Sequence, residues 1–374
     1  MADEFVVRAR QALTMPLDAP ALRSYDPAGD IDARDREITG LVEDACVWVK
    51  DGLIEWVGPW DARPKKARKD SLPLMETNLV TPGWIDCHTH AVFAGERSDE
   101  FVLRNAGRPY VEILEAGGGI LNTVDAVRRT SRKALAEALV PRVVDFVRQG
   151  VTLVEIKSGY GLSTEDELKC LRAIDDIRED LPCELVSCFL GAHAIPRNFR
   201  ERRDEYVDLV CDEMIPRVAA EKLAAYCDVF CDRGAFTVDE ARRVLQTGIE
   251  HGLIPRIHAD ELTDAGAARL AAEVGAASAD HLEFTSDDAI DAMAEAGVVA
   301  VLMPAVNLFL GTIDHAARAR RLVAGLLEVI FLDIAEVNAA DSAGRAKTAA
   351  LAKLLVTPQA GELPVATAAA ASPR

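Results

Sequence analysis

The chain has 374 residues, of which 49% are hydrophobic and 28% charged, so it has the composition of a soluble globular protein and is too long for one small domain. Its formal net charge of −19 opposes binding to phosphate backbones, and we expect no nucleic-acid partner. The N-terminus has no apolar run of signal-peptide length, and a later apolar run is broken at Pro304 and Asn307, so we expect a cytoplasmic protein with no membrane partner. The eight cysteines form no CxxC pair, so we expect reduced thiols.

The N-terminal residues show the pattern of a small β-rich domain. Two apolar runs flank Asp51-Gly52, a dipeptide that strongly favours a two-residue hairpin turn. The charged segment 61–70, DARPKKARKD, is interpreted as a solvated loop. We therefore predict a β-sandwich-like domain over residues 1–78, which residues 345–374 could complete.

From Trp84 onward the chain alternates short β-type runs with helical stretches, a pattern typical of parallel strands joined by helices. Helices are predicted over 164–179, opening with a Thr164/Glu167 capping box, and over 237–251. Eight such units match the usual length of a closed (β/α)8 barrel, about 250 residues. We therefore predict an α/β fold with a TIM-like barrel over residues 79–344. The predicted strands are 84–90, 151–157, 185–190, 226–230, 255–258, 278–281, 298–302 and 328–332.

Histidines gather at the predicted carboxyl ends of these strands, where such a barrel builds its active site. His88 and His90 end the first strand, and residues two apart on an extended chain point the same way. His193 follows the third strand, while His258 and His281 end the fifth and sixth. Unrelated core histidines have no reason to share one rim, so the pattern predicts a metal site.

Three imidazoles and one carboxylate at this rim suit one zinc or iron ion per chain with an open position for water. An ion of this kind makes bound water acidic enough to act as a nucleophile at neutral pH, so hydrolysis is expected. Glu261 and His281 are candidates for moving the protons. The predicted ligands are His88, His90, His258 and Asp333, the last of which follows the eighth strand.

Six segments carry a family resemblance: TPGWIDCHTHAVFAGERSDEF (81–101), EIKSGYGL (155–162), GAHAIP (191–196), DEYVDLVCDEMIP (204–216), IHADEL (257–262) and SADHLEF (278–284). They closely resemble the imidazolonepropionase family of the amidohydrolase superfamily, over about residues 40–333. The HxH motif marks only the superfamily, whereas GERSDEF and KSGYGL are far more specific to this family.

That family opens the imidazolone ring of imidazolonepropionate to formiminoglutamate in histidine breakdown, so the resemblance implies this activity and a small anionic substrate. The residues agree, because the Arg97 guanidinium can bind a carboxylate bidentately and the glycine-rich turn 158–161 can present Tyr160 to a ligand. The resemblance implies the metal ligands given above, catalytic roles for His281, Glu261 and Asp333, and substrate-binding roles for Arg97, Tyr110, Tyr160, His193 and Glu261.

Two departures from the family leave alternatives open. The family's Asn-Pro-Gly is absent after Asp333, and Asp341 competes with Asp333 for the ligand role. An alanine-rich tail over 363–374 stands where the family continues its small domain, so that domain is expected to be incomplete. The alternative functions are a heterocyclic-amine deaminase of the same superfamily and a catalytically weakened metal-binding barrel. The oligomeric state is also open, a homodimer being one option.

Overall fold

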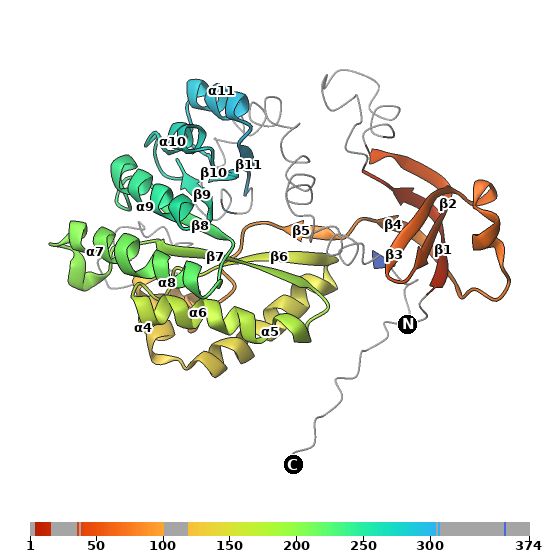
Figure 1. The fold of residues 1–374 in the computed structure, drawn as a ribbon, viewed down its shortest axis with the longest axis horizontal. Coiled ribbons are helices and arrows are strands. Elements are labelled where there is room, and N and C mark those ends of the chain that lie inside the picture. The colour runs from red at the N-terminus through yellow and green to blue at the C-terminus, as the bar shows by residue number, and fades with distance from the viewer. Residues whose placement is uncertain are drawn as a thin grey trace, which may run out of the picture. The chain divides into compact units, whose positions relative to one another are not determined.

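The computed structural model describes residues 4–15, 36, 39–100, 119–303 and 306, and the backbone of 355–356. The chain divides into two compact units (Figure 1). One comprises Met1–Gly83 with Asn338–Arg374, and the other comprises Trp84–Val337.

The first unit contains a five-stranded sheet in the order β12-β4-β1-β2-β3. The pairs β1–β2, β2–β3 and β12–β4 are antiparallel, while β1 and β4 are parallel. Because β12 pairs with β4, a segment far along the chain contributes to this N-terminal sheet. The strands are β1 (Glu4–Leu13), β2 (Leu41–Lys50), β3 (Leu53–Pro59), β4 (Leu74–Thr81) and β12 (Leu355–Val356).

The predicted hairpin turn joins β2 and β3, with Asp51 and Gly52 at φ values of 51° and 79°. The charged segment 61–70 is more ordered than the loop that we predicted. It contributes to two short 3-10 helices, η2 (Trp60–Ala62) and η3 (Lys65–Arg68).

The second unit contains a curled sheet of seven parallel strands, ordered from β11 back to β5, with helices packed along it (Figure 1). Seven of the eight predicted barrel strands are confirmed, and the eighth, 328–332, lies outside the described residues. The strands are β5 (Trp84–Asp86), β6 (Val151–Lys157), β7 (Glu184–Ala192), β8 (Tyr226–Cys231), β9 (Ile254–Ala259), β10 (Ser278–His281) and β11 (Val299–Val301).

The helices of this unit bury their apolar faces against the strands in one continuous core. No helix in the described part of the chain is long and apolar enough to cross a membrane. The helices are α4 (Ile120–Arg129), α5 (Arg132–Arg148), α6 (Thr164–Asp176), α7 (Arg203–Leu209), α8 (Ile215–Ala220), α9 (Val238–Glu250), α10 (Ala267–Val274) and α11 (Asp287–Ala296), with the 3-10 helices η4 (Arg178–Asp180) and η5 (Arg197–Phe199) and the π-helix η6 (Val210–Met214).

The predicted capping box of α6 is wrong. The helix is capped one residue earlier, where the Ser163 hydroxyl accepts the backbone N–H of Asp166. Glu167 does not close a box because its carboxylate faces the preceding turn. Helix α6 also ends at Asp176, before the predicted end at residue 179.

We expect Thr237→Ala to lower the free energy of unfolding by about 1 kcal/mol, since the Thr237 hydroxyl caps α9 in a reciprocal box with Glu240. Urea unfolding followed by circular dichroism measures the change. Thr247→Ala is the matched control, because that hydroxyl bonds to a carbonyl within the same helix. Equal losses in the two variants would contradict the capping role.

Candidate metal centre and active site

His88 and His90 enter the site from the segment that follows β5, a strand that stops short of the predicted end at His90. Their direction is set by Thr89, which is anchored to β6. The Thr89 hydroxyl donates to the Glu155 carbonyl at 2.6 Å, and the Thr89 carbonyl accepts the Lys157 N–H at 2.9 Å. The flanking imidazoles lie close together, with ring centroids 5.2 Å apart.

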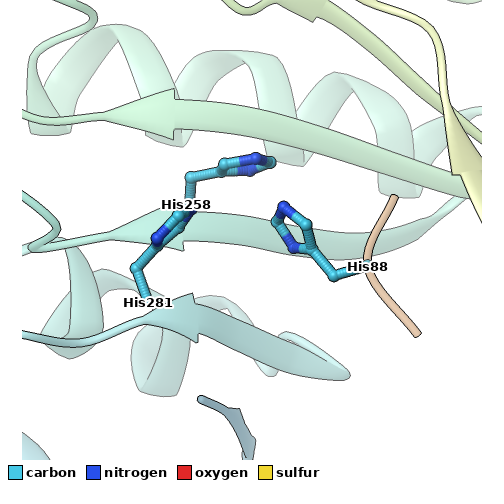
Figure 2. Close-up of side chains that lie close together, drawn as sticks. All are labelled: His88, His258 and His281. Carbon is cyan, nitrogen blue, oxygen red and sulfur yellow. The ribbon is translucent and has the colours of Figure 1, made fainter. Parts of the chain in front are cut away.

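Four imidazoles converge at this end of the sheet. Figure 2 shows His88, His258 and His281 turned toward one another, and one nitrogen of each lies within 4.8 Å of the others. His90 Nε2 lies 3.3 Å from His258 Nε2. Two ligands at about 2.0–2.1 Å from a tetrahedral ion are about 3.3–3.4 Å apart, so this pair is spaced like two ligands of one metal.

Three of the four imidazoles have the protonation state that a metal requires. Burial lowers the pKa of His88 to about 3, and burial also lowers the pKa values of His90 and His281 well below the usual range. Neutral imidazoles are metal ligands, whereas imidazolium ions are not. The buried Nδ1 of His90 has no hydrogen-bond partner among the described residues. The donor set therefore fits a divalent cation.

Two buried carboxylates lie behind the imidazoles. Asp280 Oδ2 is 2.6 Å from His88 Nδ1, and Asp228 Oδ1 is 3.1 Å from His258 Nδ1. Burial alone would raise both carboxyl pKa values, but the neighbouring cationic groups outweigh it, so both pKa values are lowered. An ionised carboxylate keeps the ring proton on Nδ1 and leaves the Nε2 lone pair for a metal.

Two further carboxylates flank His281. The backbone at His281 has a positive φ of 81°, and that at Leu282 a positive φ of 71°. Glu261 follows β9, and its Oε2 lies 3.7 Å from His281 Nε2. Glu283 Oε2 lies 3.9 Å from His281 Nδ1. Burial raises the pKa of each of these carboxyl groups to about 7. Groups with such pKa values can exchange protons at neutral pH.

The opposite side of the cluster carries the residues predicted to bind substrate. The His193 ring stacks on His90, with centroids 4.9 Å apart, and lies 5.3 Å from the Tyr160 ring. Burial lowers the pKa of His193 to about 3, and the positive charge of Arg97 acts in the same direction. The Arg97 guanidinium is therefore within electrostatic reach of the cluster.

The turn that carries Tyr160 is held by Glu167. This fully buried carboxylate accepts the backbone N–H groups of Gly159, Gly161 and Leu162 at 2.7–2.8 Å. A Cβ at position 161 would lie 2.4 Å from the backbone at the start of α6, so the turn and the helix are in direct contact. The site therefore receives Tyr160 from a rigid segment.

We expect Glu167→Gln to destabilise the protein by about 1–3 kcal/mol, because an amide cannot accept all three backbone N–H groups. Thermal and urea unfolding measure the loss. Glu165→Gln is the control in the same helix, since that side chain is 72% exposed and its ion pair with Arg217 contributes little. Comparable stability of the Glu167 variant and the control would refute the role of the carboxylate.

The structure brings most of the predicted site residues together, and Arg97 lies in the segment that follows His90. The residues gathered around the imidazoles are His88, His90, Tyr160, His193, His258, Glu261 and His281. Tyr110, Asp333 and its rival Asp341 lie outside the described residues.

Sequence reasoning missed the buried charges around the imidazoles. For the five of them that lie on strands, the signal was a charged residue inside a parallel strand, where a buried charge is found only with a partner; Glu167 lies on α6 and Glu283 follows β10. The missed residues are Glu155, Lys157, Glu167, Asp228, Arg256, Asp280 and Glu283.

Comparisons with known proteins give a family and relatives for most of the chain. The model of the amidohydrolase family matches residues 79–355. The chain is 49% identical to an imidazolonepropionase of Myxococcus xanthus over 284 residues, covering 75% of this chain and 68% of that protein. It is 46% identical to an imidazolonepropionase of Geobacillus kaustophilus over 324 residues, covering 85% and 74%.

Solved structures show the same fold at low sequence identity. A triazine hydrolase from Arthobacter aurescens is 14% identical, with a TM-score of 0.54 over 87% of this chain and 70% of that one. A guanine deaminase from C. acetobutylicum is 14% identical, with a TM-score of 0.52 over 92% and 81%. At these identities the likeness shows the fold alone.

Proposed function

Because the chain belongs to the amidohydrolase family and its relatives at 46–49% identity are imidazolonepropionases, we propose that it hydrolyses the imidazolone ring of imidazolonepropionate to formiminoglutamate. The reaction cleaves a C–N bond in a cyclic amide. The observation that carries the proposal is the convergence of His88, His90 and His258 beside the proton-exchanging pair Glu261 and His281.

His88, His90 and His258 would hold one divalent ion, zinc or iron, because imidazole ligands suit both metals. Asp333, which lies outside the described residues, is the proposed carboxylate ligand and a participant in catalysis. When bound, the ion polarises the ring carbonyl and makes water acidic enough to attack it at neutral pH.

The protein's own residues would orient the substrate and move its protons. Glu261, as a carboxylate, accepts a proton from the attacking water and passes it to His281 beside it, and the neutral His281 imidazole relays that proton to the departing ring nitrogen. Arg97 binds the propionate carboxylate, while Tyr160 and His193 contact the ring from the side of His90. Tyr110 is proposed to bind substrate from outside the described residues.

A ring-opening assay on imidazolonepropionate, with elemental analysis of the same sample, tests the function. We expect substrate consumption and about one zinc or iron per chain. Ammonia release from guanine or cytosine without ring opening would instead support a deaminase. Bound metal without turnover of any cyclic amide would support a catalytically weakened barrel.

We also propose a cytoplasmic enzyme that acts on a small anionic molecule and has no nucleic-acid or membrane partner. The net charge of −19 and eight free cysteines, seven of them buried, support this proposal. Cell fractionation tests the location.

A further inference from the structure

We propose that Lys157 is a positioning residue for the metal centre, because its ammonium group holds the two carboxylates that orient His88 and His258. The inference rests on the proposed metal site, but it does not depend on which ring the enzyme opens.

The Lys157 ammonium lies at the meeting point of three buried carboxylates. It ends β6 and is fully buried, and its Nζ lies 2.8 Å from Glu155 Oε1. The same atom lies 2.9 Å from Asp228 Oδ2 on β8 and 3.6 Å from Asp280 Oδ2 on β10. The contact with Glu155 is a hydrogen bond, and the contacts with Asp228 and Asp280 are ion pairs, so one positive charge links carboxylates from three alternate strands of the sheet.

Each linked aspartate reaches one imidazole of the centre. Asp280 Oδ2 lies 2.6 Å from His88 Nδ1, and Asp228 Oδ1 lies 3.1 Å from His258 Nδ1. Those two imidazoles come from different parts of the sheet and face each other in Figure 2. The Lys157 ammonium therefore contacts each ring through one carboxylate, so it couples the orientation of the His88 ring to that of the His258 ring.

The other buried cation of the network cannot take over this role. Arg256 Nη2 lies 3.1 Å from Asp280 Oδ2. Among the lysines and arginines that the structure describes, however, only Lys157 forms an ion pair with Asp228. Without it, three buried carboxylates would face one guanidinium, and Asp228 would be repelled by its neighbours. The largest effect should therefore reach His258.

The test is zinc affinity, measured by competition with a chelator, in Lys157→Met. We expect affinity to fall about 10- to 100-fold, as for other residues that orient metal ligands. The visible spectrum of the cobalt-substituted protein should also change, because it reports the ligand geometry. Lys169→Met is the control, since that lysine pairs with Asp166 in the same barrel. Its zinc affinity and cobalt spectrum should match those of the unmodified protein.

Asp228→Asn and the double variant Lys157→Met/Asp228→Asn identify the route. If Lys157 acts through Asp228, the double variant binds zinc no more weakly than the weaker single variant. Losses that multiply, or a Lys157→Met protein with unchanged affinity and spectrum, would overturn the proposal.

The double variant also keeps the test decisive if Lys157→Met alone does not fold, because it removes one buried charge of each sign. A further loss of zinc affinity of about tenfold relative to Asp228→Asn would then contradict the proposal. A protein that binds zinc but leaves imidazolonepropionate intact would disprove the proposed function and leave this test valid.

Discussion

His258→Ala is expected to remove the bound metal and to slow ring opening by about 10³- to 10⁵-fold, equivalent to several kcal/mol of transition-state stabilisation. His258 Nε2 lies 3.3 Å from His90 Nε2, and the two nitrogens are spaced like two ligands of one metal. The substitution removes one of these two ligands. It also leaves Asp228 without the imidazole that it orients. Elemental analysis and the ring-opening assay on one preparation measure both effects.

His251→Ala provides the comparison, because this exposed histidine caps the end of α9 and its ring bonds only to a carbonyl of the same helix among the described residues. Its metal content and rate should equal those of the unmodified protein. Retention of one metal per chain and normal turnover by His258→Ala would eliminate the proposed centre.

Glu261→Gln should lower kcat by about 10²- to 10⁴-fold, the usual contribution of a positioned acid or base. The carboxyl group of Glu261 lies beside His281, and burial raises its pKa to about 7. Because the carboxylate form accepts the proton, kcat/KM of the unmodified enzyme should fall about tenfold per pH unit below this pKa. A glutamine does not ionise, so that acidic limb should disappear in the variant.

Two variants make this assignment specific. Glu250→Gln changes an exposed glutamate at the end of α9 and should preserve both rate and pH profile. Glu283 also has a pKa raised by burial to about 7, so Glu283→Gln must be profiled as well. An acidic limb that persists in Glu261→Gln but vanishes in Glu283→Gln would make Glu283 the base.

Barrel strands with strong local signals were predictable from the sequence. Strands β6 and β10 have the predicted bounds, and β6 is a short, mainly apolar run. The predicted first residue of α6 is confirmed, but its capping residue was misassigned because Ser163 and Thr164 are both good capping residues. Only the tertiary structure shows that Glu167 bonds to the preceding turn.

The candidate site was predictable where its residues lie in the last positions of a strand, as His258 and His281 do. Its supporting charges were not, because their partners are distant in the chain. Lys157 meets Asp228 and Asp280 only after three separate strands have taken their places in the sheet. No local pattern specifies that pairing, although a lysine at the end of an apolar strand indicates that some partner exists.

If Tyr160 binds substrate as proposed, the turn around it limits where directed evolution can alter the specificity of the enzyme. A side chain at Gly159, whose φ is +101°, would meet His193 Nδ1 at 2.9 Å, and one at Gly161 would collide with the backbone of α6. Libraries that randomise these glycines would therefore be dominated by misfolded proteins. Diversity placed at Tyr160 alone would vary the surface offered to a new heterocycle while preserving its support.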